Sequence, residues 1–206
     1  MMKVLMLNGS PHDAGCLYTA LHEMEKVFAE EGIETELIQV GKMDIRGCLA
    51  CEYCATHGKC AIDDIVNEIA QKLEAADGLV LGSPVYYGSA NATLDALLDR
   101  LFYSAHFDLR MKVGAAVCSA RRGGLTATFD QLNKYFTISG MPVAAGQYWN
   151  GIHGNNASEA HQDAEGMQMM RTLARNMAFL MKSIQLGREA YGLPQVEERA
   201  WTNFIH

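Results

Sequence analysis

The sequence lacks an excess of positive charge. Its 206 residues include 17 lysines and arginines against 24 aspartates and glutamates, which gives a net charge of −7. Proteins that bind nucleic acids usually carry a basic surface that displaces counterions from the phosphates. The charge balance therefore argues against binding to nucleic acid.

Long apolar segments are also missing. No apolar run approaches the roughly 20 residues of a membrane-spanning helix, so we expect no membrane association. The apolar start, residues 1–7, is too short for a signal peptide and has no cleavage site. We expect a cytoplasmic protein. In that reducing compartment its six cysteines are more typical of metal binding or redox chemistry than of structural disulfides.

Internal repeats are absent, and short apolar runs alternate with segments of helical periodicity instead. The predicted strands are residues 4–7, 35–40, 78–81, 113–118 and 141–145. The predicted helices are residues 17–28, 65–73, 94–102, 125–138 and 163–186. This alternation predicts an α/β fold, a doubly wound five-stranded parallel sheet with helices on both faces.

Helix ends and the domain organisation follow from single residues. Gly32 should end the first helix and Gly187 the last, while Asp63 or Asp64 should cap the second. We expect one domain at residues 1–187, with a cysteine-rich insert at 41–63 and a C-terminal arm at 188–206. The apolar Trp201, Phe204 and Ile205 predict that the arm docks, with a partner subunit as a candidate surface.

The loop after the first strand, residues 8–19, has the composition of a phosphate site. It leads into a helix N-terminus, whose free N–H groups and dipole favour an anion. Ser10 and Thr19 can add hydroxyl donors, and His12 can add positive charge. The loop has neither the dinucleotide G-x-G-x-x-G pattern nor the lysine of triphosphate loops, so a monophosphate such as that of FMN fits better. A capped strand-to-helix turn is the alternative.

Two more loops should lie at the same edge of the sheet. Residues 83–89, Ser-Pro-Val-Tyr-Tyr-Gly-Ser, offer flat side chains to a planar ring. Residues 119–124, Ser-Ala-Arg-Arg-Gly-Gly, offer two glycines for close approach of the backbone. Arg121 and Arg122 can stabilise a reduced flavin or hold the phosphate of a second cofactor. The alternatives are tyrosines that pack under the next helix and arginines in a solvated loop. From this third loop we take Ser119, Arg121, Gly123 and Gly124 as candidate cofactor contacts.

Four cysteines lie within thirteen residues, spaced Cys48-x2-Cys51-x2-Cys54-x5-Cys60. Thiolates are soft ligands for iron–sulfur clusters and for zinc. The longer last gap contains Gly58, so the chain can bend back and all four cysteines can bind one centre. We favour a 4Fe–4S cluster over zinc, whose sites more often use two separated pairs. Thiols without a metal are the other alternative.

The two remaining cysteines differ from this run. Cys118 ends an apolar strand and should pack as a small hydrophobic residue. Cys16 lies at the predicted phosphate loop, where a helix N-terminus should lower the pKa of its thiol.

Together these segments resemble the iron–sulfur flavoproteins, which belong to the flavodoxin-like, NADPH-dependent FMN reductase superfamily. The resemblance covers about residues 1–145 and rests on Gly9-Ser10-Pro11 with Gly15, the cysteine run and the segment 83–89. It implies a flavodoxin-like fold, one FMN per subunit, and a homodimer or homotetramer with flavins near subunit interfaces. Its implied phosphate contacts are Ser10, His12, Cys16, Leu17, Tyr18 and Thr19. Its implied isoalloxazine contacts are Pro84, Val85, Tyr86, Tyr87 and Gly88.

The chain departs from that family pattern in three places. Many relatives have Arg where His12 stands, and many have Asn-Thr or Asn-Ser where Cys16 and Leu17 stand. The pair Arg121 and Arg122 is missing from other branches, and it points to a distinct substrate.

We therefore predict an FMN-dependent oxidoreductase of the NAD(P)H-dependent FMN reductase type. Electrons would come from NAD(P)H or a ferredoxin-like donor and pass to a small acceptor such as a quinone, with the cluster as a candidate relay. No acid or base is identified, and Arg121 and Arg122 are candidate charge stabilisers. The alternatives are a flavodoxin-type electron carrier and a thiol-based redox sensor.

Overall fold

The computed structural model describes residues 1–198 and 200–202. Its strands form one parallel sheet in the order β2-β1-β3-β4-β5. The strands are β1 Lys3–Asn8, β2 Glu34–Gln39, β3 Gly78–Pro84, β4 Val113–Ala120 and β5 Gly151–His153. This order is that of flavodoxin-like sheets, so the predicted fold class is confirmed.

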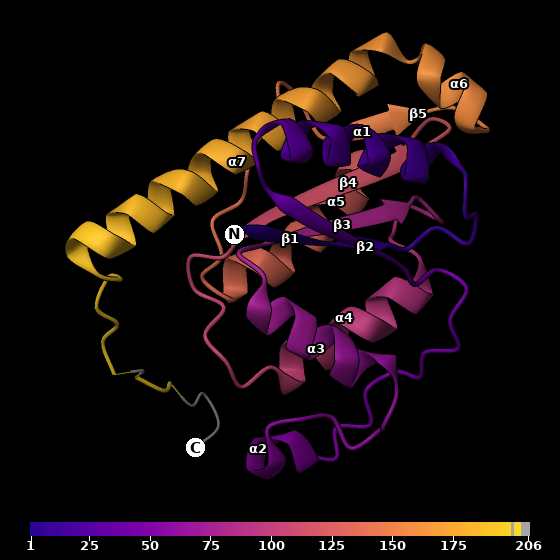
Figure 1. The fold of residues 1–206 in the computed structure, drawn as a ribbon. Helices are drawn as coiled ribbons and strands as arrows, with labels where there is room; N and C mark the ends of the chain where they lie inside the picture. Colours follow the sequence, from indigo (N-terminus) through magenta and orange to yellow (C-terminus); the bar gives the residue numbers. More distant parts are fainter. Residues whose placement is uncertain (199, 203–206) are drawn as a thin grey trace.

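Helices cover both faces of the sheet (Figure 1). They are α1 Cys16–Glu30, α2 Tyr53–His57, α3 Ile65–Ala75, α4 Ala92–Ser104, α5 Leu125–Ile138, α6 Ala157–Gln162 and α7 Ala164–Tyr191. Alternate residues of β1 point to opposite faces, so Val4 and Met6 pack with α1 and α7, while Leu5 and Leu7 pack with α3, α4 and α5. Among the helices that the structure describes, none combines the length and apolar composition needed to span a bilayer.

The fifth strand is not where the sequence predicts it. In residues 141–145 only Val143 pairs, through an isolated bridge to Gly114, whereas β5 lies ten residues later and pairs with Cys118–Ala120. Both segments follow the same edge of β4, one at its start and the other at its end. Pro142 has no N–H to donate to a ladder, which limits pairing in the earlier segment.

The last helix also differs from its prediction. It runs through Gly187 and ends at Tyr191, where Gly192 adopts a φ of +74°. Glycine lowers helix stability without ending a helix unless it takes the left-handed conformation at the C-terminus. Gly32, at φ +72°, follows α1 in this way, and Asp64 caps α3 through the Val66 N–H, both as predicted.

The C-terminal segment after α7 contains no helix or strand in residues 192–198 and 200–202. The division at residue 187 stays a prediction, and α7 crosses it. Phe204 and Ile205, which we expected to dock, lie outside the described residues.

The ends of the central strands lie level with one another. Asn8 at the end of β1 pairs with Gln39 of β2 and with Gly82 of β3. The loops that follow these strands therefore leave the sheet together. The insert, residues 41–63, instead extends past α3 and α4 and carries α2, a short helix that the sequence did not predict (Figure 1).

Candidate functional site

A cleft of about 760 Å³ opens at the carboxyl ends of β1, β3 and β4. It lies where the strand order reverses between β1 and β3, which is the position where doubly wound sheets bind ligands. Its lining consists of residues 10–17, Lys42, Pro84, Val85, Tyr86, Ser119, Ala120, Arg121 and residues 154–156. The three loops predicted from the sequence thus meet in one cleft.

Short backbone and side-chain bonds shape the first loop. The Gly9 N–H donates to the Gly82 carbonyl at 2.8 Å, the Ser10 N–H to Asn8 Oδ1 at 2.9 Å, and the His12 N–H to Ser10 Oγ at 3.1 Å. A Cβ atom on Gly9 would lie 2.9 Å from the Gly82 oxygen. Glycine at this position therefore lets the loop lie directly against β3.

The first turn of α1 faces this cleft without a side-chain cap. Its N-cap residue is Gly15, and no side chain accepts a hydrogen bond from the first N–H groups. Uncapped N–H groups at a helix N-terminus bind anions through hydrogen bonds and the helix dipole. Gly15, Cys16 and Leu17 all line the cleft, so this turn is the best place in it for a phosphate.

The residues implied as phosphate contacts divide into two groups. Ser10, His12, Cys16 and Leu17 line the cleft, although the Leu17 side chain is buried in the core and only its backbone can contact a ligand. The other two, Tyr18 and Thr19, do not line it.

Tyr18 and Thr19 make contacts within α1 instead. The Tyr18 ring stacks on His22 with centroids 5.7 Å apart. The Thr19 hydroxyl donates to the Gly15 carbonyl at 3.1 Å, so it is already used inside the helix and not directed at the cleft.

The prediction for the Cys16 thiol is wrong. Burial raises the pKa of Cys16 and the negative charge of Glu159 adds to the rise, while a backbone hydrogen bond only partly opposes them. The Cys16 Sγ donates to the Asn156 carbonyl at 3.3 Å. The thiol is therefore kept protonated at the mouth of the cleft.

The second loop ends in a tight turn. Tyr86 and Ser89 exchange two backbone hydrogen bonds of 2.9 and 3.0 Å, and Tyr87 and Gly88 between them have φ values of 54° and 77°. Two positive φ values are typical of a type I′ turn. Pro84, Val85 and Tyr86 line the cleft, but Tyr87 is fully exposed and Gly88 is outside the lining.

The third loop packs on the second. The Val85 N–H donates to the Ser119 carbonyl at 2.9 Å, and a Cβ atom on Gly124, whose φ is +88°, would lie 2.9 Å from Val85 Cγ1. Gly124 therefore allows the loops to contact each other, while nothing lies within 4 Å of a Cβ built on Gly123. Ser119 and Arg121 line the cleft, and Arg122 does not.

Sequence reasoning missed a cation in this cleft. Lys42 follows β2, lines the cleft beside the first loop and forms an ion pair with Asp13. The signal was its place just after the carboxyl end of a strand that neighbours β1. Asn155 and Asn156, which follow β5, were missed for the same reason that β5 was.

A second pocket holds the cysteines. Cys48, Cys51, Cys54 and Cys60 all line it, together with Arg100, Tyr103 and Ser104 of α4. All four are free thiols, and the pocket between them measures about 20 Å³. Within residues 1–198 and 200–202, no three His, Cys, Asp or Glu side chains are arranged to hold a metal ion.

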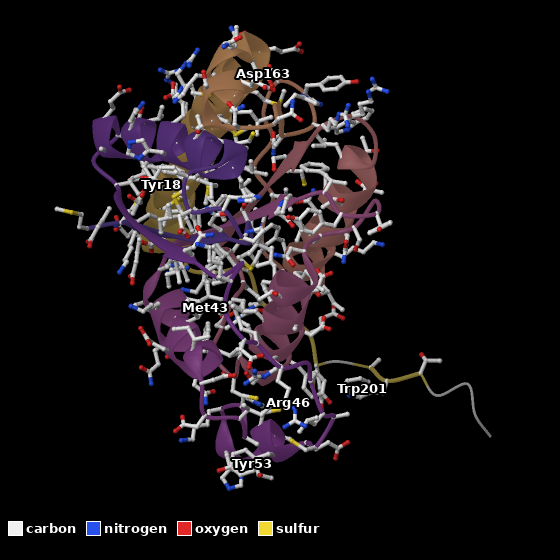
Figure 2. The ribbon with its side chains drawn as sticks, turned by 90° about the vertical axis from the view of Figure 1, so that its right-hand side faces the viewer. Tyr18, Met43, Arg46, Tyr53, Asp163 and Trp201 are labelled. Atoms are coloured by element: carbon white, nitrogen blue, oxygen red, sulfur yellow. The ribbon has the colours of Figure 1, made fainter. Side chains whose placement is uncertain are left out.

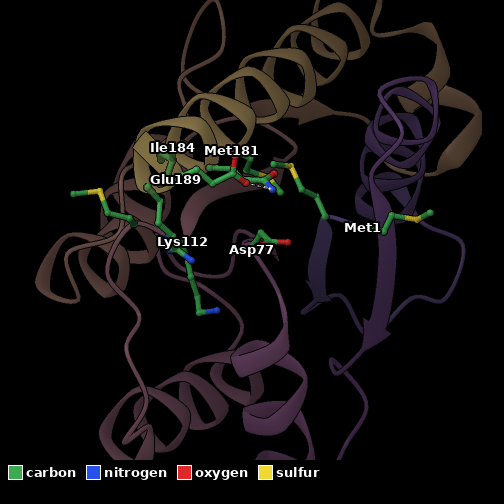
Figure 3. Close-up of a pocket in the computed structure, with 10 residues that line it drawn as sticks. Met1, Asp77, Lys112, Met181, Ile184 and Glu189 are labelled. Carbon is green, nitrogen blue, oxygen red and sulfur yellow. Dashed lines mark hydrogen bonds between the residues drawn. The ribbon is translucent and has the colours of Figure 1, made fainter. Parts of the chain in front are cut away.

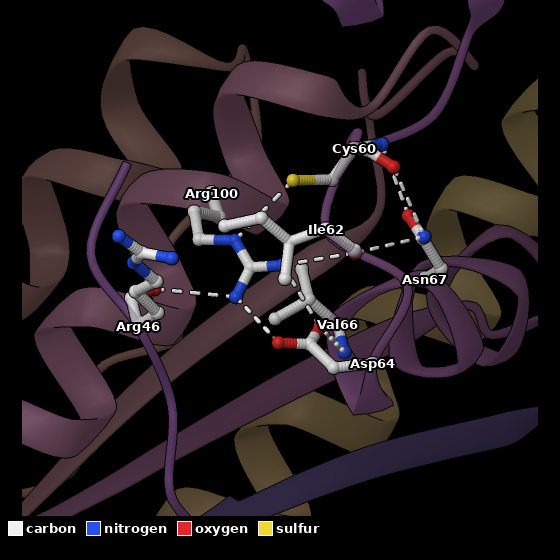
Figure 4. Close-up of polar contacts among 7 residues, drawn as sticks. All are labelled: Arg46, Cys60, Ile62, Asp64, Val66, Asn67 and Arg100. Atoms are coloured by element: carbon white, nitrogen blue, oxygen red, sulfur yellow. Dashed lines mark hydrogen bonds and ion pairs between the residues drawn. The ribbon is translucent and has the colours of Figure 1, made fainter. Parts of the chain in front are cut away.

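A buried arginine ties this cysteine segment to the domain (Figure 4). Arg100 donates through Nη1 and Nη2 to the Asp64 carboxylate at 2.7 and 2.8 Å, and through the same nitrogens to the Arg46 and Ile62 carbonyls, both at 3.2 Å. Its Nε donates to the Cys60 Sγ at 3.3 Å. The two ends of the insert are thus joined by one side chain.

The charges in this network support each other. Burial raises the pKa of Asp64, but hydrogen bonds from Arg100 and from the Val66 N–H outweigh it and hold the pKa below its usual value. Asn67 adds a further clamp, because its side chain accepts from the Cys60 N–H and donates to the Cys60 carbonyl, at 3.0 and 3.1 Å.

Helix α4 separates the cleft from the cysteine pocket. Its N-cap, Asn91, contacts Gly9 and Ser83 beside the cleft, and its last turn, with Tyr103 and Ser104, lines the cysteine pocket. A helix of 13 residues is about 20 Å long. In Figure 2, Arg46 and Tyr53 of the insert accordingly lie at the opposite end of the molecule from Asp163.

Another cleft, of about 330 Å³, lies at the amino ends of the strands (Figure 3). It is lined by Met1, Asp77, Lys112 and Met181, among others. Burial lowers the pKa of Lys112, whose Nζ donates to the Glu74 carbonyl at 2.8 Å. Ligands of doubly wound folds bind at the other edge, so this cleft is not the candidate active site.

Comparisons with known proteins agree with this placement. Residues 2–155 match the family of NADPH-dependent FMN reductases. An iron–sulfur flavoprotein of Methanocaldococcus jannaschii is 36% identical over 192 residues, which cover 89% of this chain and 100% of that protein.

Solved structures share the fold at low sequence identity. The structure of RosB, determined with 8-demethyl-8-formylriboflavin-5′-phosphate bound, has a TM-score of 0.74 at 16% identity and covers 100% of this chain and 93% of its own. An NAD(P)H:quinone oxidoreductase from Methanothermobacter marburgensis has a TM-score of 0.66 at 17% identity and covers 85% of this chain and 96% of its own.

Proposed function

Because the chain belongs to the NADPH-dependent FMN reductase family, it is an FMN-dependent oxidoreductase, and we propose that it passes electrons from NAD(P)H or a ferredoxin-like donor to a small acceptor such as a quinone. The observation that carries this proposal is the uncapped N-terminus of α1, which opens into the cleft at the β1/β3 switch point. The quinone oxidoreductase with the same fold supports the acceptor class.

The residues of the cleft fit FMN. The N–H groups of the first turn of α1 would hold the phosphate, with the Ser10 hydroxyl beside them and Lys42 supplying positive charge. Pro84, Val85 and Tyr86 would contact one side of the isoalloxazine ring. Bound FMN supplies hydride acceptance and one- or two-electron transfer, so the protein needs only to orient it and adjust its charge.

Arg121 is the candidate charge stabiliser in this site. It lines the cleft from the loop after β4, where its guanidinium can approach negative charge on the reduced ring or on a second phosphate. Arg122 does not line the cleft of a single chain, so we assign the role to Arg121 alone.

We propose a 4Fe–4S cluster for the cysteine pocket. The donor set fits, because four free thiols line one pocket, and the M. jannaschii relative is named an iron–sulfur flavoprotein. The space of about 20 Å³ has to widen to admit a cluster, and Cys48 and Cys51 lie on the exposed side that can move. A single zinc ion would need all its sulfur ligands about 2.3 Å from one point, whereas each cysteine of a 4Fe–4S cluster binds a different iron.

We also propose a homodimer or homotetramer. The outer side of α7 exposes Phe179, Leu186 and Tyr191, and large apolar side chains on one helix favour burial against another subunit. Sedimentation of the purified protein measures the assembly directly, and a monomer at micromolar concentration would contradict this part of the proposal.

The decisive experiment combines flavin binding with turnover. Purified protein is titrated with FMN and with riboflavin, and NADPH and NADH oxidation is followed with and without a benzoquinone. We expect FMN to bind more tightly than riboflavin, and quinone-dependent oxidation of one nicotinamide. Failure to bind FMN contradicts the proposal, while FMN binding without steady-state nicotinamide oxidation would indicate a flavodoxin-type carrier.

A further inference from the structure

Ser104, in the last turn of α4, has a buried hydroxyl without a partner. Its side chain is 4% exposed and lines the cysteine pocket. Helical serines often donate to the carbonyl four residues earlier, but Ser104 Oγ has no hydrogen-bond partner in the described part of the chain. A buried donor without an acceptor is unfavourable, so the position indicates that something in the pocket accepts this hydrogen bond.

Arg100 reaches the same pocket from one turn earlier on α4. It is 1% exposed, and its five N–H groups match the five acceptors around it. Asp64 balances its charge through the two terminal nitrogens, which leaves Nε for the sulfur of Cys60. Ser104 and Arg100 are four residues apart and therefore lie on the same face of the helix.

We propose that Arg100 and Ser104 are positioning residues for the cysteine-bound centre and that they set its reduction potential. This inference rests on the 4Fe–4S cluster of the proposed function. Arg100 fixes the Cys60 sulfur through Nε, and the Ser104 hydroxyl donates to a sulfur of the bound cluster or of its ligands. Hydrogen bonds to the sulfurs are among the factors that set the potential of such clusters.

The direction of the effect follows from charge. Reduction adds one electron to the cluster and no proton, so the reduced cluster is more negative. Donors and positive charge near its sulfurs stabilise that state more than the oxidised one. Removal of either donor should therefore lower the midpoint potential, whereas a purely structural role would change stability and leave the potential where it is.

The test for Ser104 uses S104A with S183A as its matched control. Ser183 is exposed on α7 and distant from the cysteine segment, so both variants lose one serine hydroxyl. Each protein is purified without oxygen and titrated with dithionite, which supplies the electron, while the reduced cluster is followed by electron paramagnetic resonance. We expect a lower midpoint potential in S104A and the wild-type value in S183A. Equal potentials in wild type and S104A would overturn the role of Ser104.

The test for Arg100 uses R100K with R110K as its control. Lysine keeps the charge beside Asp64 but lacks the Nε donor, and Arg110 forms a comparable ion pair with Asp108 on the surface. We expect R100K to show a lower potential and faster loss of iron to a chelator than R110K. A second variant, R100Q, removes the charge as well and should lower the potential further. Wild-type potentials in R100K and R100Q would overturn the role of Arg100.

Iron and sulfide assays separate this inference from the proposed function. If wild-type protein contains no iron after anaerobic purification and reconstitution, the cluster itself is wrong and both proposals fall. If wild type and variants contain the same iron and sulfide but share one potential, the cluster stands and only the inference fails.

Discussion

The side-chain amide of Asn91 donates to the carbonyl of Gly9 at 2.6 Å, across 82 positions of sequence. The same residue is the N-cap of α4, because its Oδ1 accepts from the Thr93 N–H, and its own N–H donates to Ser83 Oγ at 2.8 Å. One buried side chain thus joins the loops after β1 and β3 and starts the helix that leads to the cysteine pocket.

Replacement of Asn91 separates capping from this bridge. Serine also caps helices well, so N91S should keep most of the cap but is too short to reach Gly9. We expect a loss of about 1–3 kcal/mol in unfolding free energy, because the Gly9 carbonyl is left without its donor, together with about tenfold weaker FMN binding. Urea unfolding and FMN titration measure the two effects. Unchanged FMN affinity in a folded N91S would show that the bridge does not shape the cleft.

Two glycines in the cleft loops give a matched pair of substitutions. An alanine Cβ at Gly9 would lie 2.9 Å from both the Gly82 oxygen and Leu94 Cδ2, whereas the same atom at Gly123 meets nothing within 4 Å. We expect G9A to lose about 1–3 kcal/mol of stability and G123A to stay within about 0.5 kcal/mol of wild type. Chemical denaturation of both variants tests this, and equal losses would contradict it.

The ion pair between Lys42 and Asp13 predicts opposite effects of its two partners. K42Q removes positive charge from the cleft, so FMN should bind about three- to tenfold more weakly at low salt, with less difference at high salt. D13N removes the competing carboxylate and should strengthen binding. K182Q serves as the control, since Lys182 pairs with Glu31 on the surface. Titrations with FMN at two salt concentrations decide, and weaker binding in D13N would refute the assignment of Lys42 to the phosphate.

The pairing of Asp64 with Arg100 predicts how stability depends on pH. The pKa of Asp64 is lower in the folded protein than in the unfolded chain, where an aspartate titrates near 3.9. The pair therefore contributes its full stability above about pH 4, and that contribution is lost as the pH falls through the lower, folded pKa. In D64N this part of the acid dependence should disappear, so its stability should fall less steeply below pH 4 than that of wild type.

Denaturation at several pH values between 3 and 6 measures these slopes. D63N is the matched control, because Asp63 makes no hydrogen bond to Arg100 among those of the described residues. D63N should keep the wild-type slope. A D64N protein with the wild-type slope below pH 4 would show that the pair does not govern acid stability.

Local patterns predicted most of the fold, because β1 to β4 and their helices have apolar runs of the right period. The exception was β5, whose three residues carry a single buried aliphatic side chain, Ile152. The more apolar segment 141–145 looked like the better strand. Only the unpaired edge at the end of β4 selects Gly151–His153, and that edge is not visible in the local sequence.

The candidate site was predictable where it depends on loop chemistry and not where it depends on distant contacts. Ser10, Val85 and Arg121 follow strands and line the cleft, as strand order requires. Arg100 instead looks like a polar residue on an amphipathic helix. Its burial depends on Asp64, 36 positions earlier, and no pattern within α4 shows that pairing.

The insert leaves the domain after β2 and returns before α3 without contributing a strand to the sheet. Its two ends meet at Arg100, so the whole cysteine segment is an appendage held at one anchor. Lineages can therefore lengthen, shorten or re-equip this appendage while the flavin scaffold keeps its architecture. Divergence between relatives should concentrate in the appendage and its anchor, and spare the glycine contacts of the scaffold.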